Sequence, residues 1–210
     1  MEEEDDYWKE DIKVILIGDS GVGKTNLINV SSGGAFNENE KSSLTASYLK
    51  KVITINNEKY TLSLWDTIGQ EKLRSLSKLF FKNSKIVIYV YDITNLESFK
   101  GLESWNKDVK EMVGDDDTII KAIVGNKQDL YLSEKVSEDT ALNYASTLNA
   151  KFKLTSAKTD PKGFNSFLEE LLKDYIDKNL KNKNEDKKDG KSMKLKKKEE
   201  DKEEKKKKWC

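Results

Sequence analysis

The eight-residue segment Gly18–Thr25 constrains the fold of this chain more than any other; it reads Gly-Asp-Ser-Gly-Val-Gly-Lys-Thr. An apolar run at Lys13–Gly18 precedes it and a helical pattern at Lys24–Val30 follows it. Its three glycines let backbone N–H groups converge on a phosphate, which a Cβ would obstruct. A plain glycine-rich turn between a strand and a helix is the alternative, but the complete spacing favours a phosphate loop.

We expect this loop to hold the phosphates of a nucleotide together with Mg²⁺. Lys24 is placed to reach the β and γ oxygens, and Thr25 offers a hydroxyl to the metal. The helix that begins here points the positive end of its dipole at the ligand. The nucleotide-binding residues predicted in this segment are Asp19, Ser20, Gly21, Val22, Gly23, Lys24, Thr25 and Asn26.

Three further motifs follow in order, each after an apolar run: Trp65–Gln70, Asn126–Asp129 and Thr155–Lys158. Asp66 ends an apolar strand, where its carboxylate would face the metal through a water; the alternative is a solvated acid at a strand end. Four motifs in this order indicate a site for a guanine nucleotide, GTP or GDP.

Asp129 is expected to select guanine, because its two acceptor oxygens match the N1–H and the exocyclic amine of that base. Adenine would present an acceptor there and leave a buried charge unpaired. Asn126 would tie this loop to the phosphate loop, and Lys127 would lay its alkyl stem across the purine. The backbone N–H of Ala157 would meet the O6 oxygen of guanine.

Three further residues belong to the predicted site with less defined roles. Ser156 and Lys158 are expected to shape the loop around Ala157. Phe36 has two alternatives, packing against the base or ribose and packing in the core.

The patterns predict an α/β fold: a six-stranded, mostly parallel sheet with one antiparallel edge strand and helices on both faces. The expected strands are Lys13–Gly18, Tyr48–Ile55, Tyr60–Trp65, Ile86–Tyr91, Ile119–Gly125 and Phe152–Thr155. The expected helices are Lys24–Val30, Glu71–Lys82, Leu96–Met112, Glu138–Leu148 and Gly163–Lys178. Asn56–Glu58 reads as a hairpin turn, and the ligand should sit at the carboxyl ends of the strands.

The ends of the chain differ from its middle in composition. We expect an acidic N-terminal extension at residues 1–10, one folded domain at 11–178, and a disordered Lys/Glu-rich tail at 179–210. Residues 181–210 hold fourteen Lys against eight acids, whereas the first 180 residues hold twenty-four bases against thirty acids. This asymmetry favours an anionic membrane surface as the partner of the tail and argues against nucleic-acid binding.

Cys210 is the only cysteine, which excludes a disulfide within the chain and favours a cytosolic setting. The N-terminus lacks the basic and apolar regions of a secretory signal. No apolar run approaches the roughly 20 residues that span a bilayer, so any membrane contact should be peripheral. We expect a monomer.

These motifs resemble those of the Ras superfamily and, within it, the Rab family, over about residues 11–178. The likeness extends to Trp65–Glu71, Leu79–Lys82 and Tyr89–Thr94. It implies a P-loop NTPase fold and a GTP-hydrolysing switch that regulates vesicle traffic on the cytosolic face of an endomembrane. The implied partners are exchange factors, activating proteins, a prenyl-binding chaperone and effectors. It also implies an aromatic trio that faces effectors, at Tyr48, Trp65 and Phe80, with plain core packing as the alternative.

Two departures from the family pattern bear on hydrolysis. The first switch of the family carries a threonine that binds Mg²⁺ and the γ-phosphate; ungapped counting places Ser43 there, with Thr45 as the competing candidate. Ile68 replaces the alanine expected before Gly69, and its bulk would impede closure of Gly69 onto the phosphate or slow attack.

Hydrolysis would proceed by attack of a water that Gln70 orients, while Lys24, Mg²⁺ and backbone donors spread the charge. Arg74 is the only arginine and lies beyond Gln70, where it more plausibly faces a partner. Intrinsic turnover should therefore be slow, and an arginine from an activating protein would raise it by roughly 10³ to 10⁵.

The tail ends on Lys205–Lys208, Trp209 and Cys210. Rab proteins carry geranylgeranyl groups on terminal cysteines, usually two, so the resemblance implies one prenyl group on Cys210. One chain plus a basic cluster supplies the two signals that stable anchoring needs. The alternative is an unmodified end.

Two other functions compete with a hydrolytic switch. The chain would act as a GTP-binding membrane-recruitment module if Ile68 and Ser43 suppress hydrolysis. A phosphate-loop kinase or ATPase is disfavoured by Asp129 and by the lack of an arginine cluster.

Overall fold

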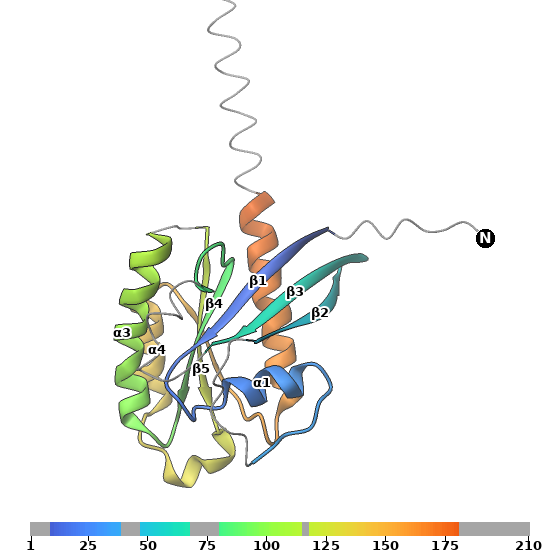
Figure 1. The fold of residues 1–210 in the computed structure, drawn as a ribbon. Coiled ribbons are helices and arrows are strands. Elements are labelled where there is room, and N and C mark those ends of the chain that lie inside the picture. The colour runs from blue at the N-terminus through green and yellow to red at the C-terminus, as the bar shows by residue number, and fades with distance from the viewer. Residues whose placement is uncertain (1–8, 39–46, 68–79, 115–117, 181–210) are drawn as a thin grey trace, which may run out of the picture.

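The computed structural model describes residues 9–38, 47–67, 80–114 and 118–180. A six-stranded sheet of order β2-β3-β1-β4-β5-β6 forms its centre (Figure 1). Only β2 is antiparallel to its neighbour, and it lies at an edge. The strands are β1 (Lys9–Ile17), β2 (Ser47–Ile55), β3 (Glu58–Asp66), β4 (Ile86–Asp92), β5 (Ile120–Asn126) and β6 (Lys151–Leu154). The predicted sheet is confirmed.

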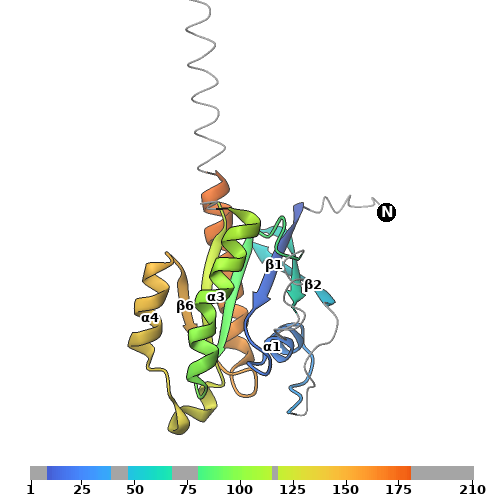
Figure 2. The ribbon, with the colours of Figure 1, turned by 60° about the vertical axis from the view of Figure 1, so that its left-hand side comes forward.

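Helices cover both faces of the sheet, and Figure 2 shows the two layers from the side. The helices are α1 (Lys24–Ser31), α3 (Leu96–Val113), the 3-10 helix η3 (Gln128–Ser133), α4 (Glu138–Thr147) and a C-terminal helix at residues 161–180. One buried cluster joins the sheet to α1 and the C-terminal helix, and a second joins it to α3 and α4. This is a P-loop NTPase architecture.

The β2–β3 hairpin turns at Asn56 and Asn57, whose φ angles are 51° and 64°. Positive φ at both central residues is the type I′ geometry, whose twist matches that of the flanking strands. Ile55 pairs with Glu58 across it. The predicted hairpin is confirmed.

Two boundaries differ from the sequence expectation. β1 begins at Lys9, so residues 9 and 10, which we assigned to the N-terminal extension, belong to the sheet. Asp11 is polar yet pairs with Thr61 of β3, and its carboxylate accepts a hydrogen bond from Ser63 and faces Lys50 at 3.3 Å. An apolar pattern does not reveal such a polar strand end. The C-terminal helix likewise includes residues 179 and 180, which we assigned to the tail.

The helix expected at Glu71–Lys82 lies mostly outside the described residues; residues 80–83 form a turn.

Candidate nucleotide site

A cavity of about 270 Å³ opens at the carboxyl ends of the parallel strands. It brings together residues from all four sequence motifs, with Thr67 as the lining residue of the second. Its walls are Ser20, Gly21, Gly23, Lys24, Thr25, Asn26, Phe36, Glu38, Thr67, Asn126, Lys127, Asp129, Leu130, Ser156, Ala157 and Lys158. Glu38, Thr67 and Leu130 were not among the predicted site residues. Thr67 and Leu130 directly follow the predicted residues Asp66 and Asp129, whereas Glu38 lies two positions after Phe36.

Backbone geometry explains the glycines of the phosphate loop. A Cβ on Gly18 would lie 2.1 Å from the carbonyl oxygen of Val90, and one on Gly23 would lie 2.3 Å from Nδ2 of Asn126. Gly21 has φ of 79° with nothing within 4 Å of its Cβ position. The loop therefore touches β4 and β5 on one side and leaves Gly21 at the open side, as a phosphate cradle requires.

Lys24 is almost completely buried at the base of the cavity. Its Nζ donates hydrogen bonds to the carbonyl oxygens of Gly18 at 2.8 Å and Asp19 at 2.9 Å. Burial lowers the pKa of Lys24 to about 8, although the carboxylates of Asp66 and Asp19 act to raise it. An incoming phosphate would supply the negative charge that favours the protonated form.

Thr25 and Asp66 meet beside the phosphate loop, where the hydroxyl of Thr25 donates to Oδ2 of Asp66 at 2.7 Å. The neighbouring Thr67 donates to the carbonyl of Leu16 at 2.6 Å and so fixes the end of β3 against β1. One hydroxyl and one carboxylate, completed by phosphate oxygens, form a donor set that suits Mg²⁺. In the described ranges no three His, Cys, Asp or Glu side chains cluster as a metal site of their own.

Asn126 at the end of β5 connects the phosphate loop to the loop that carries Ala157. Its Nδ2 donates to the carbonyl of Val22 at 2.8 Å, and its Oδ1 accepts from the N–H of Ala157 at 3.1 Å. The buried amide thus ties its loop to the phosphate loop, as expected, and also joins it to the loop of Ala157.

Ser156 does more than shape its loop. Its hydroxyl donates to Oδ1 of Asp129, and its oxygen accepts from the N–H groups of Lys158 and Thr159, each at 3.1 Å. The Asp129 carboxylate is therefore held in one orientation at the cavity wall. A carboxylate fixed in this way can discriminate between bases by hydrogen bonding.

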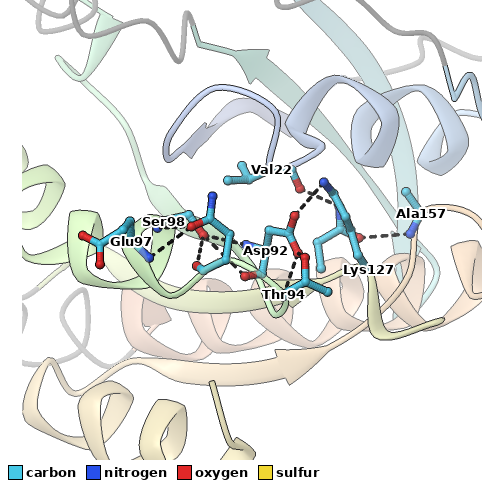
Figure 3. A network of polar contacts seen from close by, with 9 residues as sticks. Val22, Asp92, Thr94, Glu97, Ser98, Lys127 and Ala157 are labelled. Atoms are coloured by element: carbon cyan, nitrogen blue, oxygen red, sulfur yellow. Dashed lines mark hydrogen bonds and ion pairs between the residues drawn. The ribbon is translucent and has the colours of Figure 1, made fainter. Parts of the chain in front are cut away.

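Sequence reasoning missed the partner of Lys127. Oδ2 of Asp92 lies 2.6 Å from Nζ of Lys127, while Oδ1 accepts from the N–H and the hydroxyl of Thr94 at 2.8 and 2.7 Å (Figure 3). Lys127 itself has φ of 67°. The sequence shows only that Asp92 follows an apolar run; its pairing in register with Asn126, which brings it beside Lys127, is a feature of the folded sheet.

Phe36 lines the cavity and also packs against the cluster under α1. Its contact with a base or ribose stays a prediction. The Nζ of Lys158 lies 5.9 Å from the centre of the Phe36 ring and 3.4 Å from a carboxylate oxygen of Glu38. These contacts close one side of the cavity.

The predicted aromatic trio forms one cluster at the β2–β3 hairpin. The rings of Tyr48 and Trp65 stack at 5.0 Å, and Trp65 meets Phe80 at 5.7 Å. Tyr48 is 55% exposed, whereas Trp65 packs partly on the core and carries Nζ of Lys13 above its ring at 4.5 Å. Tyr48 is thus exposed, Trp65 and Phe80 are half-buried, and the role of the trio toward effectors stays a prediction.

Several predicted residues lie outside the described ranges: Ser43 with its competitor Thr45, Ile68, Gly69, Gln70, Arg74 and Cys210. Within those ranges, no helix combines the length and the apolar character that a bilayer crossing requires.

Sheet order, phosphate loop and cavity place this domain in the class of Ras-like P-loop NTPases. The Ras family model matches residues 13–177. Among known proteins, Ras-related protein Rab-21 of Geodia cydonium is 40% identical over 167 residues, which are 80% of this chain and 72% of that protein. Human Rab-21 is 38% identical over 165 residues (79% and 72%), and human Rab-22A is 37% identical over 148 residues (70% and 75%). The chain therefore belongs to the Rab family of small GTPases within the Ras superfamily.

Proposed function

We propose that this protein is a guanine-nucleotide switch that binds GTP and GDP with Mg²⁺, hydrolyses GTP slowly and regulates vesicle traffic. The observation that carries the proposal is one cavity walled by the phosphate loop, by Thr25 and by the base-reading loops. Family membership supports the same function.

Each wall of the cavity has a defined task in this proposal. The phosphate loop and Lys24 bind the phosphates, and Thr25 and Asp66 hold Mg²⁺, which neutralises phosphate charge. Asp129, fixed by Ser156, accepts hydrogen bonds from guanine. Lys127 covers the purine, and the N–H of Ala157, which donates to Oδ1 of Asn126 in this structure, is shared with O6 when guanine binds.

The remaining roles in hydrolysis fall to residues outside the described ranges. Ser43 completes the metal site, Gly69 contacts the γ-phosphate, and Gln70 orients the attacking water. An activating protein supplies the arginine that the site lacks, which makes the intrinsic rate slow.

Protein partners are proposed to bind the surface of the folded domain, and the membrane is proposed to bind the tail. Tyr48, Trp65 and Phe80 present the nucleotide state to effectors, and an exchange factor replaces GDP. Prenylated Cys210, delivered by a prenyl-binding chaperone, and the lysine cluster hold the protein on the cytosolic face of an endomembrane.

Calorimetric titration of the full chain tests the binding site. GTP and GDP should bind in a Mg²⁺-dependent way, and ATP should not compete. Asp129→Asn should weaken GTP binding by about 100-fold or more, because a donor then faces the guanine N1–H. Xanthosine triphosphate should rescue this variant, since it presents a carbonyl oxygen in place of the amine. Asp177→Asn, an exposed change on the C-terminal helix, is the matched control. Equal affinity for GTP and ATP would refute the proposal.

Single-turnover phosphate release separates the switch from the non-hydrolysing recruitment module. The wild-type chain should release phosphate slowly, and Gln70→Leu should slow it further. If the two rates are equal, Gln70 has no part in the reaction. No release even with an activating protein would favour the recruitment module.

A further inference from the structure

Asp19, the second residue of the phosphate loop, is hydrogen-bonded to helix α3. No residue of α3 lines the cavity. Oδ1 of Asp19 accepts a hydrogen bond of 2.8 Å from Nε1 of Trp105, near the middle of α3. Trp105 is 1% exposed, so its indole is held by surrounding packing. The carboxylate of Asp19 therefore lies against α3.

Gly101, one helical turn before Trp105, leaves the space for this contact. A Cβ on Gly101 would lie 2.9 and 3.1 Å from the two carboxylate oxygens of Asp19. Glycine inside a helix is unfavourable relative to alanine, because it loses more backbone freedom on folding. Close approach of Asp19 gives a physical reason for glycine at this position.

This contact reaches the phosphate site through the backbone of the same residue. The carbonyl oxygen of Asp19 accepts from Nζ of Lys24 at 2.9 Å, and the preceding Gly18 touches the carbonyl of Val90. The start of the loop is thus held on one side by β4 and on the other by α3. A shift of Asp19 away from α3 would move the carbonyl that positions Lys24.

We propose that Gly101 and Trp105 form a seat for Asp19 that positions the phosphate loop and Lys24 for nucleotide binding. The proposal rests on the function proposed above. Gly101 and Trp105 are positioning residues, since they act through Asp19 and touch no ligand.

Substitution at Gly101 separates this role from a structural one, because its two expected effects have opposite signs. Gly101→Ala improves helix propensity, so the urea midpoint of the nucleotide-free chain should stay the same or rise. The added methyl group displaces the carboxylate of Asp19 from Trp105. If this contact positions the loop, GDP should dissociate about three- to tenfold faster. Ser104→Ala is the matched control, an exposed change on the same helix, and should leave GDP dissociation unchanged.

A double-mutant cycle tests the hydrogen bond itself. Trp105→Phe keeps an aromatic ring but removes the donor, and should speed GDP dissociation about fivefold. In an Asp19→Ala background the same change should have little further effect, because both variants remove one interaction.

The assay is release of a fluorescent GDP analogue from the full chain with Mg²⁺. A wild-type rate of GDP dissociation in Gly101→Ala would overturn the proposal. An equal effect of Trp105→Phe in the wild-type and Asp19→Ala backgrounds would also overturn it. A lowered urea midpoint of nucleotide-free Gly101→Ala would assign Gly101 to folding and also overturn it. Failure of the wild-type chain to bind GDP would instead refute the underlying function.

Discussion

Asp92 shows how one carboxylate organises two loops beside the site. It pairs with Lys127 and accepts two hydrogen bonds from Thr94, so both of its oxygens have partners. The ion pair holds the lysine that is proposed to cover the purine. Asp92 should therefore affect the rate at which the nucleotide dissociates. It would act through Lys127, since it is not proposed to contact the nucleotide itself.

We expect Asp92→Asn to speed GDP release about fivefold. The amide oxygen keeps an acceptor for Thr94, but the charge that holds Lys127 is lost, at a cost of about 1 kcal/mol. Release of a fluorescent GDP analogue measures the change. Glu97→Gln, which removes an exposed ion pair to Lys100, is the control and should have no effect. An unchanged rate in Asp92→Asn would exclude the positioning role.

The lowered pKa of Lys24 predicts a proton linkage. In the nucleotide-free protein this pKa is about 8, below the ordinary value of 10.5. Between these values the unfolded chain binds more protons, so the stability of the nucleotide-free protein should rise with pH over this window. Bound phosphates favour charged Lys24, so affinity for GDP should fall as pH rises above about 8.

Calorimetry in two buffers of different ionisation enthalpy measures this linkage. Binding of GDP should take up a fraction of a proton near pH 8 and almost none near pH 6.5, where Lys24 is already charged. Equal proton uptake at both values would show that Lys24 is protonated before the phosphate arrives.

At the scale of elements, the hairpin between β2 and β3 sets the register of the edge strand. Tyr48 lies opposite Trp65 in this register, which creates the stacked pair of the aromatic trio. A slip of one residue would turn these side chains to opposite faces of the sheet. The surface proposed for effectors thus depends on the turn at Asn56 and Asn57.

Two substitutions at Asn57 should change stability in opposite directions. Asn57→Gly suits φ of 64° and should stabilise the protein by up to about 1 kcal/mol. Asn57→Ala should destabilise it by about 1 kcal/mol, because alanine lacks the side chain that tolerates this backbone region. Thermal unfolding at saturating GDP gives both values. Equal shifts of the same sign would contradict the type I′ geometry as the cause.

At the scale of the whole molecule, the nucleotide cavity lies at the carboxyl ends of the parallel strands. The C-terminal helix ends at the opposite ends of these strands (Figure 1). The nucleotide cavity therefore lies away from residue 180, the last residue of the C-terminal helix. Prenylation of Cys210 and the lysine cluster would then give two weak membrane signals, which together hold a peripheral protein.

Loss of either signal should shift the protein to the soluble fraction. Cys210→Ser should release most of the protein from membranes, because the prenyl chain supplies the apolar contact. Replacing Lys205–Lys208 with Gln should release part of the protein, because each lysine adds about 1 kcal/mol near an anionic surface. Cell fractionation and mass spectrometry of the membrane fraction measure both. Recovery of unmodified Cys210 from membranes would contradict lipid anchoring.

The local sequence pattern alone was enough to predict the sheet, the hairpin and the position of the glycine-rich loop. Apolar runs marked the buried strands, and the glycines marked the turn that approaches β4 and β5. Such features depend on neighbours in sequence, where periodicity and backbone preference act directly. The polar start of β1 was missed for the same reason, since Asp11 is stabilised by Ser63 and Lys50 from other strands.

Tertiary structure decided which side chains hold the site residues in place. The pairs Asp92 with Lys127, Ser156 with Asp129, and Trp105 with Asp19 each join segments far apart in the chain. No periodicity encodes these pairs, because they arise only when parallel strands bring their carboxyl ends to one edge. The sequence alone thus indicated the residues that are proposed to read the nucleotide, and folding decided which side chains hold them in place.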